Sequence, residues 1–436
     1  MMRSSPFLST AMLAGVLGFA LSAHAQNSPA LSAPLADENA LVRFALAHNP
    51  DLRAAHWSED IASAGVRSAA ALSNPVARGE WLHVQSPADY GWGVGLEWSP
   101  PQPGVYGSRK DAASAQVRAV KADFSERAAE LEADVRAAYA QIQALAEEIA
   151  LAEKSVDTRR AVEKAVKERV SHGAANRIDL SLASVSLARG EQERDLLALA
   201  RDSQLTRLEA LAGLPPGQTV TVQASTGAPD PVLAQSVSSA PTDGANLERR
   251  AVTTRPVLKA DAARADAADA VLATEKAKRY PWLELQARYR HHDQSPYPDD
   301  VTLGVAVTLP IFSQNSGPIA AAEASQREQH DVATAHRLGI ERDVRLLRAE
   351  SEQRKRIAEH FAQEIAPVLS DHAALVKQAL AGLELDVTVL LTAEDMVTRG
   401  GIEYLEARLA QRKAEIALAR ALGAYGRVPA ASTGQQ

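Results

Sequence analysis

One uninterrupted helical stretch limits the possible folds more than any other feature. Residues 108–172 contain neither glycine nor proline. A continuous helix over this segment would be about 95 Å long at 1.5 Å per residue, so it cannot fold back within one globular domain. Gly173 follows, and a second helical segment runs to about Leu211. The sequence therefore predicts a long antiparallel helical hairpin, with its turn near Gly173.

Apolar residues recur along this stretch with a four-three-four-three spacing, which is typical of helices packed lengthwise on partners. The series is Leu131, Val135, Ala138, Ile142, Leu145, Ile149, Ala152 and Val156. A similar register over residues 340–379 is interrupted by Ser351, Arg354 and His372, and Pro367 is expected to kink or locally unwind that helix. A generic coiled-coil scaffold would explain these heptads equally well.

The chain consists of two similar halves. Asn49-Pro50-Asp51-Leu52 corresponds to Arg255-Pro256-Val257-Leu258, and Asn74-Pro75 corresponds to Tyr280-Pro281, with an offset of 206 residues in both cases (255 − 49 and 281 − 75). We therefore expect an internal duplication. The predicted divisions are a first structural repeat at 26–214, a linker or belt segment at 215–246, a second repeat at 247–426 and a disordered tail at 427–436.

The first 25 residues have the pattern of a secretory signal peptide. Arg3 precedes the apolar run 7–21, and Ala23-His24-Ala25 forms a small-residue cleavage site. A single transmembrane anchor is the alternative, but the apolar run is short for a membrane span. Because no later segment is long, apolar and uncharged, a helical inner-membrane transporter is excluded. The absence of cysteine excludes disulfides, thiolate metal sites and a lipidated cysteine.

Each half contains two segments in which apolar and small or polar residues alternate, as expected for β-strands. They cover residues 76–84, 90–98, 282–290 and 301–309. Roughly nine residues is the length of a tilted transmembrane strand. A pair of half-buried hairpins in a soluble domain is the alternative. Four strands cannot close a barrel, so a membrane location requires several chains to share one.

Together these features resemble the TolC-like outer-membrane efflux proteins over about residues 38–425. The resemblance is carried by Asn49-Pro50-Asp51-Leu52, by Leu309-Pro310-Ile311-Phe312, by Asn315-Ser316-Gly317-Pro318-Ile319 and by Ala320-Ala321-Ala322-Glu323-Ala324. The last three segments are similar to the subgroup that serves heavy-metal pumps of the cobalt-zinc-cadmium resistance-nodulation-division type. Lipoprotein relatives carry an acylated cysteine, which this chain lacks.

The resemblance implies a mainly α-helical fold with a small β part. Three copies would share a β-barrel of about 12 strands in outer-membrane lipid, above an α-helical barrel in the periplasm of a Gram-negative bacterium. The expected function is a passive exit duct for heavy-metal cations, without a cofactor, docked to a periplasmic adaptor and an inner-membrane pump. A multidrug duct of the same family is the alternative, and a periplasmic coiled-coil adaptor or scaffold is less favoured.

Other classes of function find no support in the sequence. We identify no phosphate loop, nucleophile elbow, zinc-protease helix or dinucleotide fingerprint, so we predict that the protein is not an enzyme. The formal net charge of −7 gives no general attraction to nucleic acid.

Candidate functional residues fall into two groups. The small and polar strand positions should face the lumen: Gly91, Gly93, Gly95, Glu97, Thr302, Gly304, Ala306 and Thr308. By resemblance, the hairpin tips should form the periplasmic entrance and contact the adaptor: Gly173 and Asp179 in the first half, and Gly382, Glu384, Asp386 and Thr388 in the second. Thr388 stands where family members with an acidic constriction carry aspartate. A ring of carboxylates at the entrance would attract cations. An ordinary solvated turn is the alternative.

One cluster contains ligand types that zinc accepts. His291-His292-Asp293 and Asp299-Asp300 flank a short loop between the two strands of the second half. Because exposed histidines and acids are usually only hydrated, we predict no metal site there.

Overall fold

The computed structural model describes residues 37–85, 88–215, 218, 220–222, 244–292, 298–382 and 386–426. The expected signal peptide, the C-terminal tail at 427–436, Asp293 and Glu384 lie outside these residues, as does most of the predicted linker. All of these described residues belong to one compact unit.

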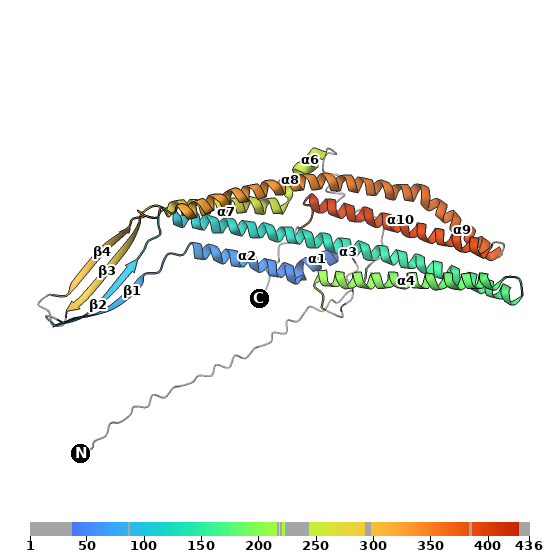
Figure 1. Cartoon of the computed structure of the whole chain (residues 1–436), viewed down its shortest axis with the longest axis horizontal. Coiled ribbons are helices and arrows are strands. Elements are labelled where there is room, and N and C mark those ends of the chain that lie inside the picture. Colours follow the sequence, from blue (N-terminus) through green and yellow to red (C-terminus); the bar gives the residue numbers. More distant parts are fainter. Residues whose placement is uncertain are drawn as a thin grey trace, which may run out of the picture. The chain divides into compact units, whose positions relative to one another are not determined.

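The same order of elements occurs twice along the chain (Figure 1). The first half contains α1 (Glu38–His48), α2 (Pro50–Ala69), β1 (Val76–Gln85), β2 (Ala88–Trp98), α3 (Val105–Ser171) and α4 (Arg177–Ala212). The second contains α6 (Gly244–Thr254), α7 (Pro256–Ala277), β3 (Trp282–His292), β4 (Asp300–Thr308), α8 (Ser316–His360), η1 (Phe361–Ile365), α9 (Ala366–Gly382) and α10 (Val387–Ala421). The predicted boundaries between domains stay a prediction.

The predicted long helix is α3, a single helix of 67 residues. Every residue of its predicted heptad series, from Leu131 to Val156, is buried. α3 packs against α4 and α7 along its length and against α10, so the heptad seam forms the spine of the protein. Gly173, with φ +73°, follows the helix in the left-handed region that favours glycine.

A side chain from the start of each half holds the C-terminal end of the same half, at Leu211-Ala212-Gly213 in the first and at Leu422-Gly423 in the second. Asn49 caps α2 by accepting from the Leu52 backbone N–H at 2.9 Å, and its Nδ2 donates to the Leu211 carbonyl at 3.0 Å. In the second half Thr254 Oγ1 donates to the Leu422 carbonyl at 2.8 Å. These contacts satisfy carbonyls at the C-terminal ends of α4 and α10, which have no partner within their own helices.

Pro367 accounts for a local change of helix type. The five residues before Ala366 form the π-helix η1, in which the Ala366 N–H donates to the Phe361 carbonyl. Proline has no N–H to donate to the carbonyl four residues earlier, so the preceding turn widens. The predicted local unwinding is confirmed. The axis of α8 and α9 changes direction at this point (Figure 1).

The four strands form one antiparallel sheet in the order β1-β2-β3-β4. β1 and β4 are therefore its two edges. The sheet lies at one end of the helices, and the α3–α4 and α9–α10 turns lie at the opposite end (Figure 1). Within the described residues, no helix is both long enough and apolar enough to cross a membrane.

Candidate functional site: the sheet and the hairpin tips

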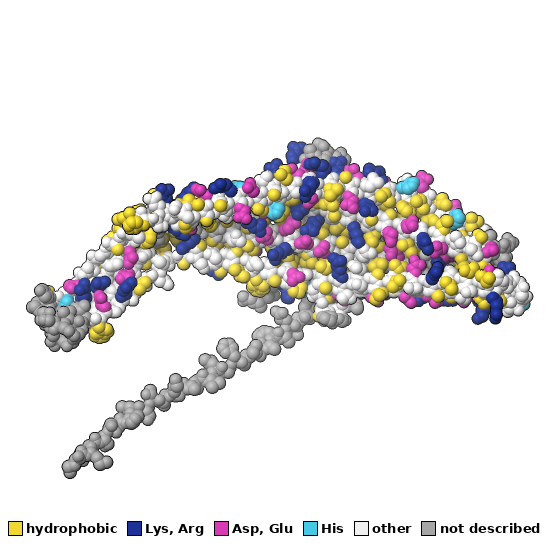
Figure 2. All heavy atoms as spheres, viewed as in Figure 1, with side chains coloured by type: hydrophobic (Ala, Val, Ile, Leu, Met, Phe, Trp, Pro, Cys, Tyr) yellow, Lys and Arg dark blue, Asp and Glu magenta, His cyan; other side chains and the backbone are white. Residues whose placement is uncertain are grey.

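The sheet has two chemically different faces, because successive residues of a strand point to opposite sides. The register places Glu97 of β2 opposite Gln286 of β3, and Thr302 and Thr308 of β4 opposite Arg288 and Trp282. The predicted lumen residues therefore share one face. Charged side chains of both signs are visible along the sheet in Figure 2.

Two ion pairs connect the strands on this polar face. Arg78 Nε of β1 lies 2.9 Å from the Glu97 carboxylate of β2. Arg288 Nε of β3 lies 3.2 Å from Glu80 Oε1 of β1, although β2 runs between these two strands. The β2 glycines permit this crossing: a Cβ added to Gly93 would lie 3.1 Å from Glu80 Cγ and 3.1 Å from Arg290 Cγ. Sequence reasoning found the glycines but missed the charged residues that lie over them, because their contact depends on the register.

The opposite face is apolar and exposed. Leu303 is 80% exposed and Trp81 is 87% exposed. The other large apolar side chains on this face are Trp92, Val94, Leu96, Leu283, Leu285, Val301, Val305 and Val307, all more than a third exposed. Exposed apolar patches of this extent mark contacts with a protein or a membrane.

The first hairpin tip contains Gly173 and Asp179. Asn176 accepts from the Asp179 backbone N–H, and the Asn176 N–H donates to Asp179 Oδ2, both at 3.3 Å. This reciprocal capping box begins α4. Asp179 therefore has a structural role that leaves its carboxylate at the tip.

The second tip is built differently. Gly382 ends α9, and Asp386 caps α10 by accepting from the Thr388 N–H at 2.7 Å. Counted from the capping residue, the position equivalent to Asp179 is Val389, an exposed apolar residue. Of the acids predicted here, Asp386 is placed at the tip, whereas Glu384 lies outside the described residues.

A buried ion pair joins the two hairpins behind their tips. Arg159 Nε of α3 lies 3.1 Å from Glu394 Oε2 of α10, and both side chains are almost fully buried. Arg159 also donates to the Ser186 carbonyl of α4, and Glu394 accepts from Thr398 Oγ1. Gly190 gives Arg159 its space, because a Cβ there would lie 3.1 Å from Arg159 Cδ.

The predicted histidine-acid cluster forms local pairs. His291 Nδ1 lies 2.8 Å from Asp299 Oδ1, Tyr289 donates to Asp299 Oδ2 at 2.6 Å, and His292 Nε2 lies 3.5 Å from Asp300. The hydrogen bond from Tyr289 is the main cause that lowers the pKa of Asp299. No set of three or more acids and histidines within the described ranges has the arrangement needed to hold a metal ion.

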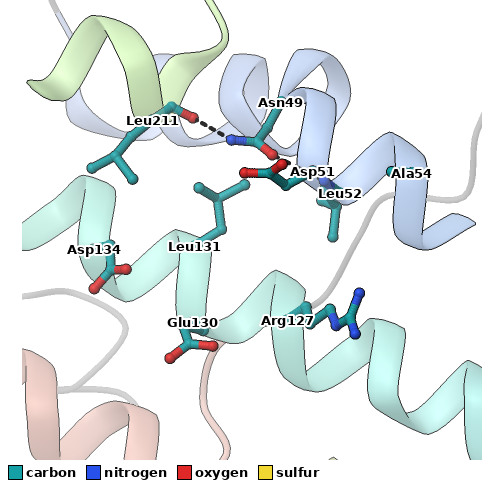
Figure 3. A pocket seen from close by; sticks show the side chains of 9 residues that line it. All are labelled: Asn49, Asp51, Leu52, Ala54, Arg127, Glu130, Leu131, Asp134 and Leu211. Carbon is teal, nitrogen blue, oxygen red and sulfur yellow. Dashed lines mark hydrogen bonds between the residues drawn. The ribbon is translucent and has the colours of Figure 1, made fainter.

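A cavity of about 540 Å³ lies where α1 and α2 meet α3 and the end of α4 (Figure 3). Asn49, Arg127, Glu130 and Asp134 line it. Burial, followed by the nearby Glu130 carboxylate, raises the pKa of Asp134. The carboxylates of Glu130 and Asp134 and the guanidinium of Arg127 therefore line the same cavity.

The first half of the chain matches a known family of proteins. Residues 41–214 match the family described as "Outer membrane efflux protein". The chain is 23% identical, over 304 residues, to the cobalt-zinc-cadmium resistance protein CzcC of Cupriavidus metallidurans. That alignment covers 70% of this chain and 66% of CzcC, just under two thirds of the length of that relative.

Solved structures share the fold. The outer-membrane channel OprN has a TM-score of 0.73 at 17% identity, covering 89% of this chain and 90% of OprN. CusC, described as undergoing conformational changes accompanying folding and transmembrane channel formation, has a TM-score of 0.74 at 17% identity, covering 89% and 93%. The predicted fold class, mainly α with a small β part, is confirmed.

The family match covers residues 41–214, and the solved structures share the fold of nearly the whole chain. The predicted resemblance to the TolC-like outer-membrane efflux proteins is confirmed over residues 41–214, and the predicted outer-membrane location agrees with that family.

Proposed function

We propose that three copies of this protein form the outer-membrane duct of a tripartite efflux system, and that this duct carries heavy-metal cations out of the cell. The observation that carries the proposal is a sheet with one charged face, one exposed apolar face and two open edges, at the end of long helical hairpins. Three such sheets, joined edge to edge, would make a barrel of about 12 strands.

The chemistry of the two faces supports a different surrounding for each. Valine, leucine and tryptophan on the outer face suit lipid, where backbone groups must all be paired within the protein. Glu97, Thr302 and Thr308, with the ion pairs of Arg78 and Arg288, would line a water-filled lumen. Because these ion pairs lie over the β2 glycines, they would place charge on the lumen surface and leave the centre of the lumen open.

The helical hairpins would continue the duct through the periplasm. Gly173, Asp179, Gly382, Glu384, Asp386 and Thr388 would form the entrance and contact a periplasmic adaptor. The adaptor would connect the duct to an inner-membrane pump of the resistance-nodulation-division type, which supplies the energy. The duct itself performs no chemical step and needs no cofactor.

Metal cations are the proposed substrate because of the similarity to CzcC and of the motifs between Leu309 and Ala324. Carboxylates at the entrance would raise the local cation concentration. The test is growth of a deletion strain on graded zinc, cobalt, cadmium, nickel and copper, beside a panel of lipophilic drugs. We expect sensitivity to one or more metals, restored by the intact gene.

Sensitivity to drugs alone would make the protein a multidrug duct. Membrane fractionation gives the complementary test. The proposal expects a heat-modifiable oligomer in the outer-membrane fraction, and full release with soluble periplasmic protein would favour an adaptor or scaffold instead.

A further inference from the structure

Helix α4 carries an apolar seam that has no partner within the described part of the chain. Five of its exposed large apolar residues follow heptad spacing, interrupted by two polar residues at the same spacing. The seam is Ile178, Leu182, Val185, Arg189, Gln192, Leu196 and Leu199. A heptad seam is the side of a helix that packs on another helix, and the five apolar residues are between 45% and 68% exposed.

Helix α9, at the other end of the row of helices from α4, also carries exposed residues at heptad spacing, which we call the α9 seam. Val368, Asp371, Leu375 and Gln378 are all exposed and are spaced three-four-three along the helix. The helices pack in the sequence α4, α3, α10, α9, so α4 and α9 are the outer members of this row. Helix α4 lies on the side of edge strand β1, and helix α9 lies on the side of edge strand β4 (Figure 1).

Positions on α4 and α9 that are the same number of residues from the tip ends of their helices lie at the same height along the helical rod. Ala183 and Val376 belong to one buried cluster, and each lies six residues from the tip end of its helix. The two tips are therefore level within one chain. Rotation about an axis along the helices preserves each residue's height, so a neighbouring copy would present α9 to α4 in this register.

That register matches the chemistry of the seams. Val185 and Leu375 lie eight and seven residues from their tips, and Arg189 and Asp371 lie twelve and eleven. Arg189 and Asp371 are both exposed, and neither has an ion pair within the described part of the chain. Arg189, which interrupts the α4 seam, would thus lie opposite Asp371, which interrupts the α9 seam, and the two side chains carry opposite charges.

We propose that the α4 seam of one copy packs antiparallel on the α9 seam of the next, with Arg189 paired to Asp371 of the partner subunit. This inference rests on the proposed trimeric duct and names the surface and register that close it near the entrance. An apolar seam alone permits sliding by one heptad, whereas a single charged layer fixes one register. Arg189 and Asp371 are thus positioning residues for the ring.

Disulfide trapping tests the register, since the chain has no cysteine of its own. We expect Val185→Cys combined with Leu375→Cys to give disulfide-linked oligomers up to the trimer in oxidised outer membranes. Val185→Cys with Val368→Cys is the matched control. Its positions are offset by about six residues, or about 9 Å along the helices, beyond the reach of a disulfide.

Charge exchange tests the pair itself. Arg189→Asp and Asp371→Arg should each lower the temperature at which the trimer dissociates in detergent, and the double exchange should restore it. A trimer that shows neither the specific cross-link nor the restoration overturns this seam and leaves the proposed function standing. A chain that stays monomeric in the outer membrane, as judged by native mass, overturns both.

Discussion

Arg288 and Glu80 form an ion pair across an intervening strand, with Arg288 Nε 3.2 Å from Glu80 Oε1. Adjacent strands lie roughly 5 Å apart, so side chains from β1 and β3 meet only where both are long and β2 offers no side chain between them. Glycines at positions 91, 93 and 95 supply that gap. The ion pair between β1 and β3 therefore depends on the glycines of β2 that lie beneath it.

Under the proposal that the polar face lines a lumen, filling the gap between β1 and β3 should narrow that lumen. Gly93→Val would place a Cβ 3.1 Å from the Cγ atoms of Glu80 and Arg290 and push both charged side chains off the wall. We expect a lower single-channel conductance of the reconstituted oligomer. Gly79→Val is the matched control, because a Cβ there meets no atom within 4 Å and Gly79 lies on the other face. Equal conductance of both variants and the wild type would contradict the assignment of this face to the lumen.

The pair of Arg159 with Glu394 should contribute more to the stability of the hairpins than an exposed ion pair does. Glu394→Ala removes the nearer of the two carboxylates beside the buried Arg159 guanidinium and leaves the partly exposed Asp395, 3.5 Å from Arg159 Nη2. We therefore expect a cost of about 3 kcal/mol, at the lower end of what breaking a buried ion pair typically costs. Circular dichroism during thermal unfolding measures the loss of helix. The exposed pair of Lys355 with Glu359 serves as control, since Glu359→Ala should cost about 1 kcal/mol or less.

A double variant separates charge from packing in the same pair. Arg159→Met combined with Glu394→Leu removes both charges and keeps much of the volume, so we expect a smaller loss than from Glu394→Ala alone. If the single and double variants unfold at the same temperature, the buried charge that remains on Arg159 is not the cause of the loss.

The structural features that could be predicted from the sequence are those that depend on a single local segment of the chain. The four strands were predicted to within two residues at each end, because alternation is visible along one segment. The helix ending before Gly173 and the unwinding before Pro367 were predicted for the same reason. The pair of Arg159 with Glu394 joins residues 235 positions apart, and no local pattern signals it. The crossing of Arg288 to Glu80 depends likewise on the sheet register.

The two hairpin tips show most clearly what the sequence alone did not reveal. Counting from the glycines paired Asp179 with Thr388, but the capping residues Asn176 and Asp386 show that the two turns differ in length by one residue. Cap geometry depends on the turn that follows each glycine, which the sequence spacing alone did not reveal.

Burial of an acid in the helical rod should make stability depend on pH. Burial, followed by the nearby Glu406 and Glu147 carboxylates, raises the pKa of Glu148 above its ordinary value. The folded state therefore binds this proton more tightly than the unfolded state, so stability falls as pH rises from the ordinary pKa through the folded one. Glu148→Gln should stabilise the protein above that window and flatten the dependence within it.

Thermal unfolding at a series of pH values measures this effect. Glu153→Gln, on the exposed side of the same helix, is the matched control for the substitution itself. Profiles of wild type and Glu148→Gln that run parallel across the acidic range would show that the Glu148 proton is not linked to folding.

The acids at the two tips should set the ion selectivity of the entrance. Asparagine caps a helix about as well as aspartate, so Asp386→Asn removes the charge and keeps the hydrogen bond to the Thr388 N–H. Asp179→Asn does the same within the capping box of α4. We expect each variant to lower the cation selectivity of the reconstituted channel, measured as the reversal potential in a salt gradient, and the double variant to lower it further. Asp386→Ala adds the loss of the cap, at about 1 kcal/mol, and separates the effect of helix fraying from that of charge. An unchanged reversal potential in the double Asn variant would show that these carboxylates do not face the ion path.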